Sequence, residues 1–155
     1  MKITDKYAEK RYIVSADQRK IVSLKDKGES RKYIADNSNR LFLTVYRVDN
    51  GLFDSSQVGN RKCDYAIYTD TDTLYLIELK GGDYASSLEQ LANTVRQMLT
   101  PEVQKPCCVY ARVVLSKTKV PAFLETKEKM LKSLLKKQYN GNLQKATREM
   151  KEIMQ

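Results

Sequence analysis

The sequence predicts a mixed α/β (α+β) domain in which helices pack on a mixed β-sheet. Short runs rich in β-branched and aromatic residues cluster between residues 33 and 79, and an amphipathic helical pattern follows at 85–99. A chain of 155 residues is long enough for one substantial hydrophobic core and too short for two. We therefore predict a single domain over residues 1–155, with its core at about 30–115 and a helical extension at about 121–154.

The first thirty residues are predicted to be helical up to about Gly28, because apolar residues are dispersed there among many charges. The polar residues 15–17 are a point at which this region can divide into two helices. Two strands at 33–35 and 41–46 are expected next. The turn-forming residues 36–39 between them predict a hairpin.

Two further strands are predicted at 63–68 and 74–79, on either side of the polar turn 69–73, which contains Asp70 and Asp72. These two aspartates alternate like calcium ligands, but the glycine and the later glutamate of an EF-hand loop are missing. We therefore expect a polar hairpin tip.

The helix at 85–99 has its apolar residues at helical spacing, with Asp83 as its expected N-cap. Residues 107–115 are apolar enough for an interior strand. Two lysine-rich helices follow at about 121–139 and 142–154, divided at Asn140-Gly141. The predicted order is helix, three or four strands, helix, strand and helices.

The residue types present exclude several kinds of chemistry. The chain has no histidine, which excludes Ser-His-Asp and Cys-His catalysis and every zinc site that needs imidazole. Its cysteines, Cys63, Cys107 and Cys108, are odd in number and are expected to be buried free thiols. No apolar stretch approaches a membrane span or the core of a signal peptide, so we expect a cytoplasmic protein without a membrane partner.

Charge is distributed unevenly along the chain. Residues 1–50 carry 12 Lys or Arg against 7 Asp or Glu, residues 51–116 carry 6 against 8, and residues 117–155 carry 10 against 4. An acidic centre between basic flanks suits a metal-using phosphodiesterase, because carboxylates bind cations and basic surfaces bind phosphates. A solvated lysine-rich surface explains the same numbers equally well.

The two strands around Thr71 bring particular charges together. A hairpin centred on Thr71 pairs position 64 with position 78, because each lies seven residues from the centre, so Asp64 and Glu78 become cross-strand neighbours about 5 Å apart at Cβ. Lys80 shares the face of Glu78, because alternate residues of a strand point the same way. Two adjacent carboxylates repel each other unless a cation joins them. A hard divalent cation such as Mg²⁺ accepts these oxygens, and Lys80 can hold or help deprotonate a water beside it.

A spaced Asp followed by Glu-x-Lys on a strand, in αβββαβ order, resembles the PD-(D/E)xK nuclease superfamily, whose fold is restriction-endonuclease-like. The resemblance covers about residues 30–115. It implies that Asp64 and Glu78 bind Mg²⁺ together with the Leu79 carbonyl, that Mn²⁺ can replace Mg²⁺, and that Lys80 positions the attacking water. The pattern departs at Cys63, which stands where the motif has proline.

The same resemblance suggests further site residues on helices. Relatives often place a glutamine on the helix after the motif, which makes Gln90 a better candidate than Gln97. They also often use an acidic residue from the first helix, for which Glu9 and Glu29 are both candidates. Gly81-Gly82 either ends the strand or lets a nucleic-acid backbone approach.

We therefore expect a Mg²⁺-dependent nuclease, similar in size and charge to DNA junction resolvases or compact restriction and defence endonucleases. DNA is the favoured substrate, with junction, duplex and RNA substrates all left open, and enzymes of this kind often act as homodimers. A catalytically inactive module that binds nucleic acid or protein is the main alternative. A further alternative is that the basic helices dock an acidic partner protein. The simplest interpretation of Asp64, Glu78 and Lys80 is ordinary charges on a solvated strand face. Against it, Glu78 and Lys80 follow a run that is apolar on both faces, where an idle charge is costly.

Overall fold

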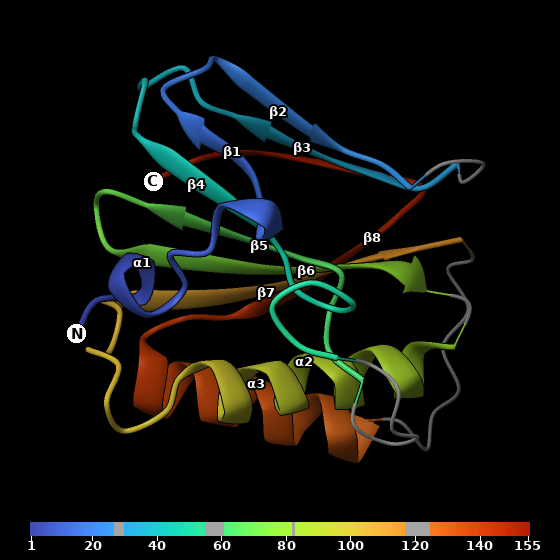
Figure 1. Ribbon diagram of the computed structural model, residues 1–155. Coiled ribbons are helices and arrows are strands. Elements are labelled where there is room, and N and C mark those ends of the chain that lie inside the picture. Colours follow the sequence, from blue (N-terminus) through green and yellow to red (C-terminus); the bar gives the residue numbers. More distant parts are fainter. Residues whose placement is uncertain (27–29, 55–60, 82, 117–124) are drawn as a thin grey trace.

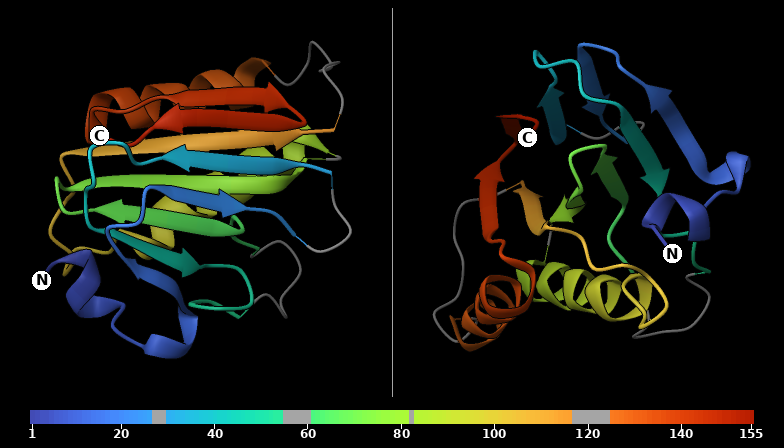
Figure 2. Two further views of the ribbon diagram at one scale, coloured as in Figure 1. Left: turned by 90° about the horizontal axis from the view of Figure 1, so that it is seen from above. Right: turned by 90° about the vertical axis from the view of Figure 1, so that its left-hand side faces the viewer.

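A six-stranded mixed sheet, in the order β1-β4-β5-β6-β7-β8, forms the centre of the molecule (Figure 1). This computed structural model describes residues 1–26, 30–54, 61–81, 83–116 and 125–155, and for Lys80, Gly81 and Glu125 it describes the backbone alone. Helices α2 and α3 cover one face of the sheet, and a second sheet, in the order β2-β3-β9, covers the other (Figure 2). The elements are α1 (Ile3–Lys6), a 3-10 turn η1 (Lys10–Tyr12), β1 (Ile13–Asp17), β2 (Ile21–Leu24), β3 (Lys32–Asp36), β4 (Leu43–Arg47), β5 (Tyr65–Thr69), β6 (Thr73–Gly81), α2 (Tyr84–Met98), β7 (Cys108–Leu115), α3 (Glu125–Tyr139), β8 (Leu143–Thr147) and β9 (Glu149–Ile153).

Strand β6 is buried on both faces because it lies between these layers. Leu74 and Leu76 join the core beneath the helices, whereas Tyr75 and Ile77 join the core between the two sheets. Each of the four side chains is at most 1% exposed. This arrangement explains the apolar run before Glu78, because alternate residues of one strand fill two separate cores.

Several sequence predictions are confirmed. The class is a mixed α/β fold with a mixed sheet, because β1, β4, β5 and β6 pair antiparallel while β6, β7 and β8 pair parallel. β7 lies inside the sheet between β6 and β8. The Asp83 carboxylate caps α2 by accepting a hydrogen bond from the Ala85 amide at 3.1 Å. The turn at Asp70 and Asp72 is a polar hairpin tip, where Asp72 accepts hydrogen bonds from the Tyr68 hydroxyl and the Cys107 amide.

The predicted helices of the first thirty residues are wrong. One helical turn (α1) and the short η1 precede strands β1 and β2. In β2, Val22 and Leu24 are buried while Ile21 and Ser23 are exposed, which is the period of a half-buried strand. Scattered charges concealed this alternation, and strands of four or five residues offer little periodicity to detect.

The predicted hairpin over 33–46 is also wrong, because β3 and β4 belong to different sheets. Asn37 is fully buried at the crossing between them. Its amide nitrogen donates to the carbonyls of Arg19 and Leu41, at 2.9 and 2.8 Å, and its side-chain oxygen accepts from the Leu41 amide. The turn predicted at 36–39 is present, but it carries the chain from β3 in one sheet to β4 in the other and does not close a hairpin.

The predicted helix at 142–154 is replaced by β8 and β9. Residues such as Lys, Glu and Met favour helices, yet β9 pairs in parallel with β3, more than a hundred residues earlier in the chain. The division at Asn140 and Gly141 is confirmed as the end of α3. Among the cysteines, Cys63 is a buried free thiol as expected, but Cys107 is exposed and Cys108 is half-buried. No helix in the described ranges has the length and apolarity to cross a membrane.

Candidate active site

The β5–β6 hairpin has the register predicted from its turn. Tyr65 pairs with Ile77 and Tyr68 pairs with Leu74, so the pairing is centred on Thr71. The pairing ends at Tyr65 and Ile77; continued by one residue, it would place Asp64 opposite Glu78. Both side chains lie on the face that carries the helices, in step with Leu74 and Leu76 of β6.

Asp64 lies where β5 begins to leave β6. Its backbone carbonyl accepts a hydrogen bond from the Val48 amide at 3.0 Å, which continues the pairing with β4. Its carboxylate oxygen Oδ2 accepts from the backbone amide of Leu79 at 2.8 Å. The side chain thus provides an acceptor for β6 just beyond the last backbone pair of β5 and β6, and only 7% of Asp64 is exposed.

Glu78 is fully buried, at 0% exposure. The thiol of Cys63 is influenced by both carboxylates. Burial raises the pKa of Cys63, and the negative charges of Glu78 and Asp64 raise it further. The three groups therefore share one enclosed environment, in which two negative charges are costly unless a cation or a proton compensates them.

Thr94 anchors helix α2 over the region that contains Asp64, Glu78 and Cys63. The backbone amide of Cys63 donates to Thr94 Oγ1 at 2.9 Å, and Thr94 Oγ1 donates to the Gln90 carbonyl at 2.7 Å. This chain of hydrogen bonds fixes the segment entering Asp64 against the second half of α2. Thr94 was not predicted as a site residue. Its position four residues after Gln90, on the same helix face, is the feature of the sequence that indicates it.

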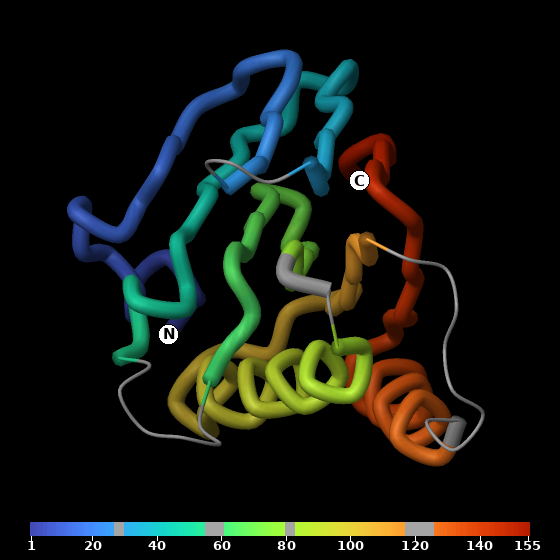
Figure 3. Tube along the Cα trace, turned by 90° about the vertical axis from the view of Figure 1, so that its right-hand side faces the viewer, coloured from blue at the N-terminus to red at the C-terminus, as the bar shows by residue number. Residues whose placement is uncertain are grey.

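Glu78 lies near the carboxyl end of β6. Figure 3 shows the ends of β6 and β7 and the start of α2 at the same edge of the sheet. Ligands of open α/β sheets bind preferentially outside the carboxyl ends of the strands. The pairing of β6 with β7 also shifts register between Glu78 and Gly81. A bulge of this kind re-aims side chains, and bulges are frequent beside active sites.

Lys80 and Leu79 follow Glu78 on the same strand. The backbone of Lys80 lies in β6, but its side chain is outside the described part of the structure. Leu79 places its side chain in the core between the two sheets, at 1% exposure, and its amide on Asp64. Its backbone therefore runs directly beside the Asp64 carboxylate.

Gln90 is half-buried on α2 and lines a small polar pocket of about 190 Å³. Asn93 lines the same pocket and donates its side-chain amide to the Arg61 carbonyl at 3.2 Å. The remaining lining residues are Arg61, Ser86 and Glu89. Sequence reasoning identified Gln90 but missed Arg61 and Asn93, although Arg61 lies three residues before Asp64 and Asn93 three residues after Gln90.

The acidic residues expected from a first helix do not join this site in the described structure. Glu9 is exposed and pairs with Arg11 at 3.3 Å, and Glu29 lies outside the described residues, as does Gly82. No group of three His, Cys, Asp or Glu side chains suited to a metal ion occurs within the ranges described. The acidic part of the site therefore consists of Asp64 and Glu78.

A buried lysine was also missed. Lys62 is only 1% exposed, and its Nζ lies 5.5 Å from the centre of the Phe53 ring. Burial lowers the pKa of Lys62, and the nearby Asp49 carboxylate opposes that shift. The Lys62 amide donates to the same carboxylate at 3.2 Å. These contacts hold the segment that leads into Asp64.

A lysine lies against the first turn of α2. Lys145 of β8 lies with its Nζ 4.9 Å from the centre of the Tyr84 ring and pairs with Glu128 of α3. The exposed lysines of α3 are Lys127, Lys129, Lys132, Lys136 and Lys137. Half of the ten basic residues of the C-terminal segment 117–155 thus lie on α3, beside α2.

No protein-family model, no curated protein and no solved structure matches this chain.

Proposed function

We propose that this chain is a Mg²⁺-dependent endonuclease that hydrolyses phosphodiester bonds of DNA. The proposal is supported by the hairpin register, which ends one residue before Asp64 and Glu78, and by the hydrogen bond from the Leu79 amide to Asp64 Oδ2. Both carboxylates are enclosed, and each raises the pKa of Cys63 through its charge. A divalent cation is the ligand that best relieves their mutual repulsion.

The donor set suits Mg²⁺ because it consists of hard oxygen atoms. Asp64 and Glu78 would hold the ion, together with the backbone carbonyl of Leu79, whose amide already contacts Asp64. Mg²⁺ usually binds one or two carboxylates and retains several waters, so two acidic residues suffice. A bound Mg²⁺ or Mn²⁺ would supply Lewis-acid polarisation of the phosphoryl oxygens and a more acidic water.

Other residues have supporting roles in this proposal. Lys80 follows Glu78 by two residues on β6 and would orient the attacking water. Gln90 would contact the substrate from α2, where it shares a pocket with Arg61. The exposed lysines of α3 would bind the phosphate backbone without reading sequence. A homodimer would provide the second site that cutting both strands of a duplex requires.

Cleavage of labelled nucleic acids tests this proposal directly. Duplex DNA, single-stranded DNA, a four-way junction and RNA are incubated with Mg²⁺, Mn²⁺ or EDTA. We expect metal-dependent cutting that falls at least about 100-fold in Glu78→Gln and Lys80→Ala, since even partners of metal ligands contribute about 10–100-fold. Glu149→Gln and Lys151→Ala, exposed charges on β9, are the matched controls and retain activity. Cutting that survives Glu78→Gln would refute the assigned site.

A binding module without catalysis is the second candidate, and one observation favours it. The Asp64 carboxylate already bonds the Leu79 amide, and Glu78 is fully buried, so both residues have structural roles. Thermal unfolding separates the two functions. A metal site predicts that Mg²⁺ or Mn²⁺ raises the Tm of the wild type but not of Glu78→Gln, whereas a binding module predicts no metal effect in either protein.

A further inference from the structure

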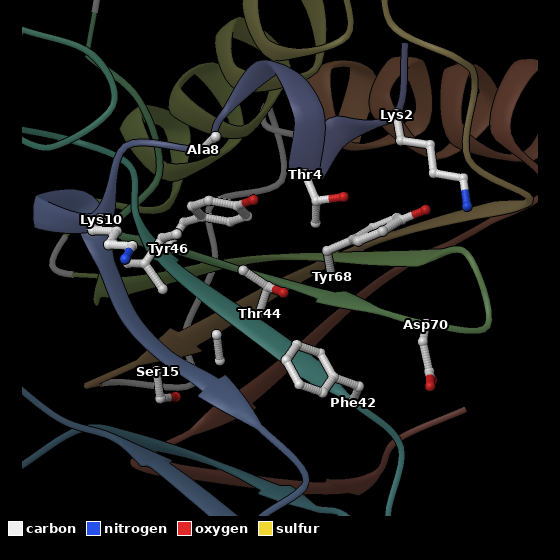
Figure 4. A pocket seen from close by; sticks show the side chains of 12 residues that line it. Lys2, Thr4, Ala8, Lys10, Ser15, Phe42, Thr44, Tyr46, Tyr68 and Asp70 are labelled. Carbon is white, nitrogen blue, oxygen red and sulfur yellow. The ribbon is translucent and has the colours of Figure 1, made fainter.

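One hollow of the described structure lies outside the candidate active site. A pocket of about 660 Å³ opens between the N-terminal segment and strands β1, β4 and β5 (Figure 4). Thr44 and Tyr46 of β4 and Tyr68 of β5 line one side, and Ser15 of β1 lines another. Its volume falls within the usual range for sites that enclose a small molecule, about 300–1,000 Å³.

The N-terminal segment that borders this pocket is fastened to the loop after α2. The Met1 ammonium donates to the Glu102 carbonyl at 2.9 Å, and the Gln104 amide donates to the Met1 carbonyl at 2.6 Å. The Tyr7 hydroxyl donates to the Met98 carbonyl at 2.7 Å in a buried contact. The pocket is therefore preformed, and a ligand would not have to order its wall.

Three aromatic rings line the pocket. Phe42 is 41% exposed and offers a ring face to a ligand, whereas Tyr46 and Tyr68 are buried. A hydrogen bond from the Tyr68 hydroxyl to Asp72 fixes the second tyrosine. Planar heteroaromatic rings stack on such side chains.

The polar atoms of the pocket distinguish a nucleobase from an alkyl chain. The Tyr46 hydroxyl is buried and, in the described part of the chain, has no hydrogen-bond partner. Figure 4 shows this ring among the residues that line the pocket. Thr4, Ser15 and Thr44 also line the pocket, so its wall carries hydroxyl groups that suit the donors and acceptors at the edge of a base better than an alkyl chain.

Two cations stand on opposite sides of the pocket. Lys2 and Lys10 are both exposed, and Figure 4 shows one at each end of the lining, with Asp70 as the opposing charge. A ligand that has a flat ring and a negatively charged group on each side of that ring matches this arrangement. A nucleotide within a strand has that form, because a phosphate precedes and follows its base.

We propose that this pocket binds one unpaired nucleotide of a nucleic-acid strand, with its base against the exposed ring of Phe42 and its flanking phosphates toward Lys2 and Lys10. The inference rests on the proposed function, which supplies a nucleic-acid substrate. Tyr46 pairs with Ala66, which lies two residues from Asp64 on the same face of β5, about 7 Å along the strand. The pocket would thus hold a displaced base beside the cleavage site and confer a preference for single-stranded or branched DNA.

Binding measured in EDTA tests this inference separately from catalysis, because no metal is then available to Asp64 and Glu78. The probe is a short fluorescent oligodeoxythymidylate, titrated into wild type, Phe42→Ala, Lys10→Ala and Tyr46→Phe. We expect Phe42→Ala to weaken binding about fivefold or more, as loss of a stacked base does. Met130→Ala, an exposed apolar residue on α3, is the control and binds as wild type.

Amide chemical shifts provide the second measurement. With the oligonucleotide, we expect perturbed resonances at β4 and at η1, and the same set perturbed in Glu78→Gln. Unchanged affinity in both Phe42→Ala and Lys10→Ala would overturn the inference, even if the chain cleaves DNA. Tighter binding of decanoate than of the oligonucleotide, improved further by Tyr46→Phe, would identify an alkyl-anion site instead and would also overturn it.

Discussion

The Arg112 guanidinium and the Glu152 carboxylate form a buried ion pair that joins β7 of the six-stranded sheet to β9 of the three-stranded sheet. Arg112 Nε lies 2.9 and 3.0 Å from the two carboxylate oxygens, and Arg112 is only 3% exposed. Tyr33 of β3 donates its hydroxyl to the same carboxylate, and Asn142 accepts from the guanidinium at 2.7 Å. The last strand of the second sheet is thereby tied to the central sheet.

Glu152→Gln is expected to lower the free energy of unfolding by about 3–5 kcal/mol, because it leaves the Arg112 charge buried and uncompensated. The measurement is urea denaturation followed by circular dichroism. The control is Glu149→Gln, which breaks an exposed pair with Lys32 and should cost less than about 1 kcal/mol. Equal effects of the two changes would contradict this account of the buried pair.

Asp64→Ala is expected to cost about 1–3 kcal/mol of stability, because the buried Leu79 amide loses its acceptor. Asp64→Asn keeps an acceptor oxygen and should cost less, while removing the negative charge that a cation needs. Unfolding in EDTA measures the first effect, and the shift of Tm with Mg²⁺ measures the second. If Asn destabilised the protein as much as Ala, the hydrogen bond to Leu79 would not be the reason.

Gly141→Ala is expected to destabilise the protein by at least about 1–3 kcal/mol, the usual cost of overpacking. A Cβ atom at this position would lie 1.7 Å from the Val109 carbonyl oxygen, so β7 or the turn after α3 would have to move. The neighbouring Asn140 has φ 49°, a conformation that glycine adopts without strain. Asn140→Gly should therefore be nearly neutral, and thermal unfolding of both variants checks the contrast.

We expect the protein to lose stability at alkaline pH because of Tyr7. Burial raises the pKa of Tyr7 from its ordinary value of 10.0 to about 12. Below pH 10 its contribution is fully present; between pH 10 and 12 the unfolded chain releases the phenolic proton before the folded protein does, so stability falls. In Tyr7→Phe, the free energy of unfolding should fall less steeply with pH, and the difference in slope should correspond to at most one proton. Urea denaturation of both proteins across this pH range measures the difference, and parallel curves would contradict the assignment.

Tyr46→Phe is expected to leave stability unchanged or to raise it by up to about 1–2 kcal/mol in the absence of nucleic acid. The change removes a buried hydroxyl without a partner in the described structure and keeps the ring that packs edge-on against Tyr7. Tyr7→Phe is the contrasting change, because its hydroxyl donates to Met98 and its removal should cost about 0.5–1.5 kcal/mol. Thermal unfolding ranks the two variants, and the reverse order would contradict the hydrogen bonding seen here.

The sequence alone determined the features that depend on neighbouring residues. The polar turn around Thr71 set the register of the β5–β6 hairpin, and with it the approach of Asp64 to Glu78. The helical spacing of apolar residues after Asp83 defined α2, because a 15-residue pattern is long enough to separate a period of 3.6 from a period of 2.

Tertiary structure decided what depends on distant residues. β9 has the composition of a helix and becomes a strand because β3 offers it a parallel partner and Arg112 a buried charge partner. The turn after β3 changes sheets because Asn37 finds its hydrogen bonds in two other segments. The role of Thr94 in fastening α2 over Cys63 likewise depends on packing. Such contacts form only after the layers meet, so no local pattern in the chain specifies them.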